Sequence, residues 1–132
     1  MDVDAKLPVS LFEGKTILVT GGTGSFGGYF IDYLLDKKFK EIRVFSRDEL
    51  KQDDMRLRLQ NSKVKFYIGD VRDRSSVDDA MPGVDYVFHA AALKQVPACE
   101  FFPMQAMQTN VIGSQNVIES AISHGVSKVV SL

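Results

Sequence analysis

The chain of 132 residues is 45% hydrophobic and 25% charged, with a formal net charge of −1, an ordinary balance for a soluble globular protein. This length has room for one domain with a hydrophobic core, and the near-neutral charge argues against nucleic-acid partners. No apolar run approaches the roughly 18 residues of a membrane span, and the acidic first residues are unlike a secretory signal. The single cysteine, Cys99, excludes an internal disulfide, so we expect a cytoplasmic protein, and no metal site is predicted.

The predicted elements alternate between strand and helix. Residues 1–13 show little periodicity and are expected to form an N-terminal arm before a domain over residues 14–132. Hydrophobic patterning predicts strands at residues 15–20, 41–45, 64–68, 84–90 and 128–132. Helices are predicted at residues 25–37, from the N-cap Asp48 to 60, at 75–81, and at 104–124, where Gly125 ends the last one.

Such alternation predicts an α/β fold, because each helix serves as a right-handed crossover between parallel strands. We expect a Rossmann-type doubly wound parallel sheet of order 3-2-1-4-5, truncated after the fifth strand. Ligands are expected at the carboxyl ends of strands one and four, where the winding reverses.

Three glycines spaced three residues apart follow the first predicted strand and open the first predicted helix. In this context the first glycine allows a tight turn, the second lets the main chain approach a pyrophosphate, and the third lets helix and strand pack closely. The helix N-terminus then directs N–H groups and its positive dipole end at the phosphates. An ordinary strand–helix turn is the alternative, but the context favours a dinucleotide-binding loop with Gly21, Thr23, Gly24, Ser25, Phe26 and Gly27 at the cofactor.

The end of the second strand bears on the choice of cofactor. NAD-binding versions of this fold place an acidic residue there for the ribose 2′-OH. This chain has Ser46 and Arg47 instead, and no carboxylate until Asp48. A hydroxyl and a planar guanidinium suit a 2′-phosphate, and Lys51 could add charge, so NADP is predicted over NAD. The alternative is that Arg47 and Lys51 are solvated surface charges.

Residues after the third and fourth strands extend the predicted site. Asp70 and Val71 are expected beside the adenine, with Asp70 accepting from its amino group; a plain helix cap is the alternative for Asp70. Small residues after strand four, Ala90, Ala91 and Ala92, let the backbone pass close to the ribose and nicotinamide.

Four further residues are candidates for structural or supporting roles. His89 falls within a buried strand and is expected to be a hydrogen-bonded core histidine rather than a catalytic one. Cys99 lacks a cationic neighbour and is read as a structural or incidental thiol. Lys94 follows the small-residue run at the ligand edge and is either a surface lysine or a cofactor or substrate contact. Asn110 falls on the small apolar face of the long helix, where a buried amide needs partners, and is expected to support the site.

The chain resembles the extended short-chain dehydrogenase/reductase family over residues 12–132. More narrowly it is similar to the nucleotide-sugar dehydratases and epimerases of bacterial polysaccharide biosynthesis, above all to inverting UDP-N-acetylglucosamine 4,6-dehydratases and their capsular relatives. The segments that carry the resemblance are TGGTGSFG (20–27), FSRDELKQDDM (45–55), FYIGDVRD (66–73), HAAALKQVPACEFFP (89–103) and TNVIGSQNVI (109–118).

The resemblance implies NADP held by the 21–27 loop, with Ser46 and Arg47 on the 2′-phosphate, and it matches Lys94 and Asn110 to the family's lysine and structural asparagine. In such enzymes the cofactor takes hydride from C4 of the sugar, water is eliminated across C5–C6, and the hydride returns to C6. The family's Ser/Thr-Asp-Lys segment and its Tyr (or Met)-x-x-x-Lys motif are expected beyond Leu132, with the lobe that binds the UDP-sugar. We therefore expect no catalytic pair in this chain, which is read as an NADP-binding portion, inactive alone.

Other readings stay open. A UDP-sugar 4-epimerase would share all these motifs, and a stand-alone NADP-binding sensor or docking module belongs to a different class. A homo-oligomer is expected. We also expect an exposed apolar surface on strand five and the long helix, where the rest of an enzyme would pack.

Overall fold

The computed structural model describes residues 9–90 and 103–131, with side chains for residues 11–90 and 111–131. Its core is one parallel sheet of order β3-β2-β1-β4-β5, as the sequence predicts. The strands are β1 (Thr16–Thr20), β2 (Glu41–Ser46), β3 (Val64–Ile68), β4 (Tyr86–His89) and β5 (Lys128–Ser131). The predicted fold class is therefore confirmed.

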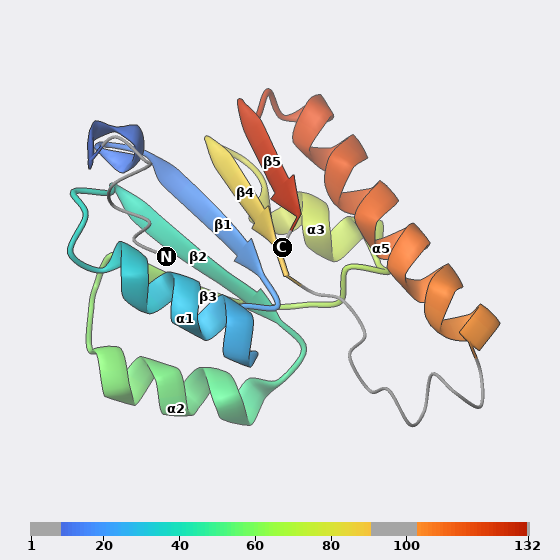
Figure 1. Cartoon of the computed structure of the whole chain (residues 1–132), viewed down its shortest axis with the longest axis horizontal. Coiled ribbons are helices and arrows are strands. Elements are labelled where there is room, and N and C mark those ends of the chain that lie inside the picture. The colour runs from blue at the N-terminus through green and yellow to red at the C-terminus, as the bar shows by residue number, and fades with distance from the viewer. Residues whose placement is uncertain (1–8, 91–102, 132) are drawn as a thin grey trace.

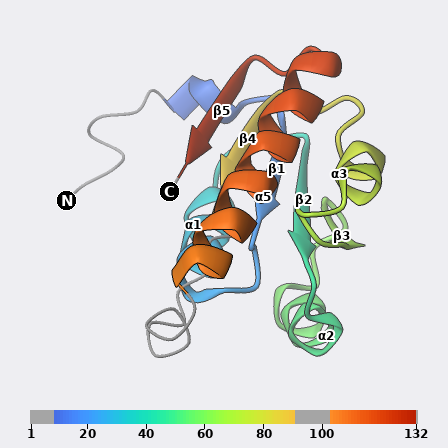
Figure 2. The same ribbon diagram turned by 90° about the vertical axis from the view of Figure 1, so that its right-hand side faces the viewer.

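Helices cover both faces of the sheet (Figures 1 and 2). They are α1 (Ser25–Leu34), α2 (Glu49–Leu59), α3 (Arg74–Ala80) and α5 (Pro103–Ser123), and a 3-10 helix η1 (Val9–Phe12) precedes β1. Alternate residues of β1 separate the two layers: Ile17 and Val19 pack with α1 and α2, whereas Leu18 packs with α3 and α5. Each face thus has its own apolar cluster, as a doubly wound sheet requires.

The boundaries differ from the predicted ones by a few residues. Helix α1 ends at Leu34 rather than at residue 37, and β4 begins at Tyr86 rather than at residue 84. Residues 9–12, which the sequence assigns to an arm, form η1, and Phe12 is fully buried against the rings of Phe30, Tyr33 and Tyr86. The limits of the arm and of the domain stay a prediction.

Within the described residues, no helix is both long and apolar enough to cross a membrane, and no cluster of acidic, histidine or cysteine side chains could hold a metal ion.

Candidate dinucleotide-binding site

The turn between β1 and α1 lies at the carboxyl edge of the sheet. Gly21 adopts φ 65°, a conformation that side chains beyond glycine rarely tolerate, and this lets the chain reverse directly after the strand. The N–H groups of Gly21 and Gly22 both point to the carbonyl of Phe45 on β2, at 2.8 and 3.3 Å. The turn is therefore held against the end of the neighbouring strand.

Helix α1 begins close against that turn. A Cβ on Gly27 would lie 2.7 Å from Cα of Gly22 and would also meet the carbonyl oxygen of Gly21, so only glycine permits this approach. Gly24 is the N-cap and has no side chain to bond the first N–H groups of the helix. A helix start of this kind suits phosphate oxygens, because its N–H groups lack intrahelical partners and its dipole favours negative charge.

The tip of β2 is fixed by α2. Asp48 caps this helix by accepting from the N–H of Lys51 at 3.0 Å, as predicted. Ser46 is 8% exposed, and its Oγ lies 3.0 Å from Nε2 of Gln52. The side chain of Arg47, in contrast, is 63% exposed.

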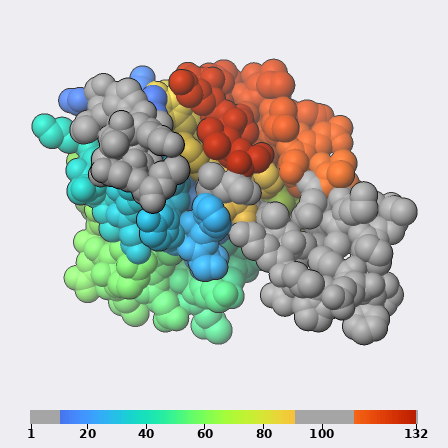
Figure 3. Space-filling view, in the orientation of Figure 1, coloured from blue at the N-terminus to red at the C-terminus, as the bar shows by residue number. Residues whose placement is uncertain are grey.

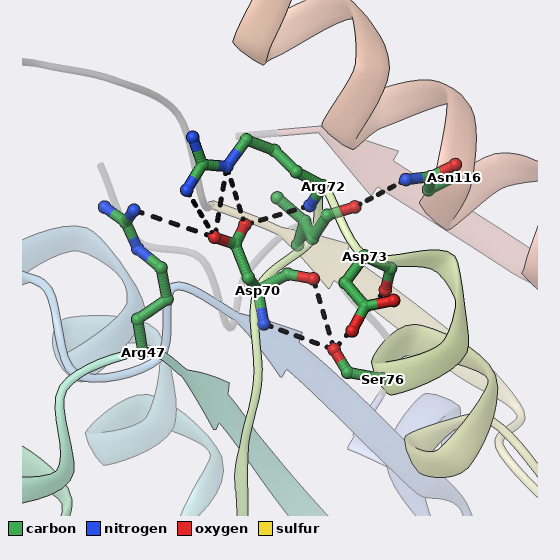
Figure 4. Close-up of polar contacts among 7 residues, drawn as sticks. Arg47, Asp70, Arg72, Asp73, Ser76 and Asn116 are labelled. Carbon is green, nitrogen blue, oxygen red and sulfur yellow. Dashed lines mark hydrogen bonds and ion pairs between the residues drawn. The ribbon is translucent and has the colours of Figure 1, made fainter.

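Asp70, just past β3, is bound by two arginines (Figure 4). Arg72 Nε and Nη2 lie 3.0 and 2.6 Å from its Oδ2, while Arg47 Nη1 lies 3.8 Å from the same oxygen. Hydrogen bonds from the Arg72 side chain lower the pKa of the Asp70 carboxyl, so this group is ionised at neutral pH. The helix-cap alternative for Asp70 is wrong: the side chain of Asp73 caps α3 by accepting from the N–H of Ser75.

A shallow cleft of about 330 Å³ separates α1 from α2 beside the glycine turn. Figure 3 shows the two helices side by side on the face toward the viewer. The cleft joins part of the turn to the charged face of α2. Its lining residues are Thr23, Gly24, Ser25, Gly28, Tyr29, Asp32, Lys51, Asp54, Met55 and Arg58. Arg58 is paired with Asp32 at 3.1 Å, whereas no ion pair involves Lys51 among the described residues.

His89 at the end of β4 is a hydrogen-bonded core residue, as predicted. It is 8% exposed, with Nδ1 2.6 Å from Oγ1 of Thr20 and Nε2 3.2 Å from Oγ of Ser114. Burial lowers the pKa of the imidazole, which favours its neutral form. Ala90, the first of the three predicted alanines, donates its N–H to Thr20 Oγ1 at 3.1 Å.

Helix α5 approaches the turn after β3 closely. A Cβ on Gly113 would lie 2.7 Å from Cγ2 of Val71, and Asn116 donates to the Val71 carbonyl at 2.8 Å. The backbone of Val71, which follows Asp70 in the chain, is thereby held against α5. Val117 and Ala121 are buried on the same face, as predicted, so the small residues of α5 do pack on the sheet layer.

Several predicted residues cannot be placed. Ala91, Ala92, Lys94 and Cys99 lie outside the described residues, and Asn110 lies in α5 with a side chain that is not described. The described residues of the prediction do converge: the 21–27 turn, the β2 tip, the Asp70–Val71 turn and Ala90 all stand at the carboxyl ends of the strands. Their contacts with a cofactor stay predictions.

The sequence analysis missed three residues that shape this edge. They are Gln52, Arg72 and Asn116, each bonded to a predicted site residue or its backbone. The position of Asn116 beside Gly113 and Val117, on the helix face that packs on the sheet, indicated that its side chain could be partly buried. The positions of Gln52 and Arg72 gave little indication of a structural role, since both lie in charged segments that usually face solvent.

Comparison with known proteins gives a consistent picture. Residues 17–132 match the model of a family described as polysaccharide biosynthesis protein. UDP-glucose 4-epimerase of Rickettsia prowazekii (strain Madrid E) is 60% identical over an alignment of 126 residues, and the match covers 92% of this chain and 37% of that protein. The chain thus spans little more than a third of the length of this curated relative.

Two solved structures extend the comparison. Pen from Bacillus thuringiensis is 42% identical with a TM-score of 0.86, over 92% of this chain and 37% of that one. DesIV, a dTDP-glucose 4,6-dehydratase from Streptomyces venezuelae with NAD and TYD bound, is 27% identical with a TM-score of 0.75, over 86% of this chain and 38% of that one.

Proposed function

The chain belongs to the polysaccharide biosynthesis branch of the extended short-chain dehydrogenase/reductase family, and on that premise we propose that it holds the nicotinamide cofactor of a nucleotide-sugar epimerase or dehydratase. The observation that carries the proposal is the glycine turn, where Gly27 admits no Cβ and the N-cap Gly24 leaves the start of α1 open to a pyrophosphate.

Two reactions of this class are candidates. The relatives named UDP-glucose 4-epimerase favour 4-epimerisation. The likeness to DesIV and the sequence resemblance to UDP-N-acetylglucosamine 4,6-dehydratases favour dehydration as the second candidate. In either case a bound nicotinamide would supply reversible hydride acceptance at C4 of the sugar, which both an inversion at C4 and a loss of water across C5–C6 require.

The residues of this chain are proposed to bind and orient the cofactor. The 21–27 turn and the start of α1 receive the pyrophosphate, Asp70 and Val71 receive the adenine, and Ala90 follows the cofactor toward the nicotinamide. Asp70 retains acceptor capacity for the adenine amino group, because each carboxylate oxygen can accept more than one bond. Lys94 and Asn110 are proposed as a contact and a supporting residue on the nicotinamide side.

The proposed cofactor is NADP. The β2 tip presents Ser46 and an exposed Arg47, with Lys51 in the adjacent cleft, where an NAD site of this fold has a carboxylate. Asp70 does not prevent this, because Arg72 makes the closer contacts to its carboxylate and leaves Arg47 available. NAD is the alternative, and the DesIV structure contains it.

Calorimetric titration of the protein with NADP and NAD tests the choice. We expect NADP to bind at least about tenfold more tightly, since a charge-assisted bond to a phosphate contributes that much. Arg47→Ala should remove most of the difference. Arg56→Ala is the matched control, because Arg56 is an exposed arginine on α2 that pairs with Asp53 and does not line the cleft. Equal affinities in the wild type would contradict the preference.

The reaction is tested on the full-length protein with UDP-glucose and UDP-N-acetylglucosamine. An epimeric sugar supports the 4-epimerase, and a product lighter by one water supports the dehydratase. Binding of the cofactor without either product would instead favour a stand-alone NADP-binding module.

A further inference from the structure

Gln52 lies on the inner face of α2 beneath the tip of β2. The residue is 1% exposed although its helix is strongly charged. Its Nε2 donates to the carbonyl of Tyr67 at 2.9 Å and to Oγ of Ser46 at 3.0 Å, and lies 3.4 Å from the Ser46 carbonyl. One amide group therefore links α2 to the carboxyl ends of β2 and β3.

The orientation of this amide is fixed by its neighbours. If the amide were reversed, its oxygen would face the carbonyl oxygens of Ser46 and Tyr67, which donate nothing. In the observed orientation Oε1 is the buried side-chain atom without a hydrogen-bond partner among the described residues. A buried carbonyl left unpaired offsets part of the stability that the hydrogen bonds of Nε2 contribute.

The bond from Gln52 determines what Ser46 can do. Because Ser46 Oγ accepts from Gln52, its own proton remains to be donated, and within the described part of the chain Ser46 Oγ forms no second hydrogen bond. Ser46 ends β2 on the same face as Ile42 and Val44, which is the face that packs against α1 and α2. The hydroxyl proton is thus held ready for an acceptor at the ribose position.

A phosphate and a hydroxyl respond differently to a fixed donor. A 2′-phosphate offers only acceptor oxygens at neutral pH and forms a charge-assisted bond with the hydroxyl. A ribose 2′-OH must share its bonds as both donor and acceptor, and gains less from the same proton. We propose that Gln52 is a positioning residue for cofactor choice, which presents Ser46 as a donor to the 2′-phosphate of NADP. The inference rests on the proposed NADP site.

The charges around the tip agree with this role. Arg47 and Lys51 lie near Ser46 in the sequence, and Arg58 forms an ion pair with Asp32. Asp54 also lines the cleft and opposes them. The net positive charge around the tip of β2 is therefore small. The oriented hydroxyl of Ser46 has more influence on the choice between NADP and NAD here than it would have in a strongly basic pocket.

The test is the ratio of the dissociation constants for NAD and NADP, because the two cofactors share every contact except that of the 2′-phosphate. Gln52→Met keeps the volume of the side chain and removes its N–H donors. We expect the preference for NADP to fall about fivefold to tenfold in Gln52→Met and further in Gln52→Glu, whose carboxylate attracts the Ser46 proton and repels a phosphate. Gln115→Met, at an exposed glutamine of α5, should leave the ratio unchanged.

A double-mutant cycle separates positioning from loosening of the helix. In a Ser46→Ala background, Gln52→Met should change the ratio less than about twofold, since the hydroxyl that it orients is gone. A general loosening of α2 would alter both cofactors equally and would not depend on Ser46.

The outcomes are distinct. An unchanged ratio in Gln52→Met, with a wild type that prefers NADP, overturns the inference and leaves the NADP proposal standing. A wild type without preference overturns the NADP proposal itself. If the Gln52 variants do not fold, Ser46→Ala decides alone: full retention of the preference in that variant overturns the role of the hydroxyl and hence of Gln52.

Discussion

Thr20 and His89 join the carboxyl ends of β1 and β4, with Oγ1 and Nδ1 2.6 Å apart. Thr20 Oγ1 also accepts from the N–H of Ala90, and Nε2 of His89 lies 3.2 Å from Oγ of Ser114 on α5. The two strands that flank the reversal of the sheet are thereby tied to α5. His89 is a buried structural link between these strands and α5, and burial lowers the pKa of its imidazole, which favours the neutral form.

This link predicts a pH dependence of stability. Burial lowers the pKa of His89 below its ordinary value of 6.5, so between the two values the unfolded state binds more protons than the folded one. The free energy of unfolding should therefore fall as the pH drops below about 6.5. Urea denaturation from pH 7.5 downward measures it.

His89→Gln should flatten that slope, because the amide keeps a donor and an acceptor but does not titrate. His124→Gln, which replaces the other histidine of the chain, should keep it. The lowered pKa values of Asp70 and Asp78 act in a separate window, below 3.8. An identical slope in His89→Gln and wild type would contradict the structural role.

Gly27 and Gly28 are adjacent in α1 but should respond oppositely to alanine. In Gly27→Ala the new Cβ meets the backbone of Gly21 and Gly22, so we expect a loss of about 1–3 kcal/mol and weaker binding of both cofactors. In Gly28→Ala the nearest atoms are 3.9 Å away, and helix propensity should add up to about 1 kcal/mol. Equal effects in thermal denaturation would refute the close packing of α1 on the turn.

Asn116 should affect the adenine end without affecting cofactor choice. Asn116→Ala leaves the carbonyl of Val71 without its 2.8 Å partner and loosens the turn that carries Asp70. We expect about 1 kcal/mol less stability and a similar rise in the dissociation constants for NADP and NAD. Fluorescence titration of both cofactors checks this, and a selective loss of one of them would disagree with the placement of Asp70 and Val71 at the adenine.

The apolar surface that the sequence predicts is present on α5 and β5. Its members are 37–74% exposed: Val111, Ile112, Ile118, Ile122, Val129 and Val130. Self-association of the 132-residue chain through this surface should weaken in Ile118→Gln/Ile122→Gln. Leu50→Gln/Leu57→Gln, at equally exposed leucines of α2, is the control. Sedimentation that shows a monomeric wild type at all concentrations would contradict self-association.

The sheet order and the glycine turn follow directly from the sequence, because alternating elements and glycine spacing constrain the backbone itself. The hydrogen-bond partners of side chains are harder to predict from the sequence. Asp70 and Asp73 both precede α3, and only the structure shows that Asp73 caps the helix. Asp70 is instead paired with Arg72, two residues later in the same turn.

Helix α2 shows most clearly that the sequence pattern does not determine which side chains are buried. The apolar residues in the second half of this helix are Met55, Leu57 and Leu59, yet Leu57 is 69% exposed, because residues two apart on a helix point to nearly opposite sides. Gln52, a polar residue, takes an inward position next to Met55. Its burial depends on where β2 and β3 end beneath the helix, which no local pattern encodes.

Competition between two small nucleotides measures whether the β2 tip recognises a 2′-phosphate. Adenosine 2′,5′-bisphosphate and 5′-AMP differ only in that phosphate, so their affinities for the protein isolate the contribution of Ser46, Arg47 and Lys51. We predict at least about tenfold tighter binding of the bisphosphate, reduced to near equality in Arg47→Ala. Equal binding of the two nucleotides to the wild-type protein would contradict the account.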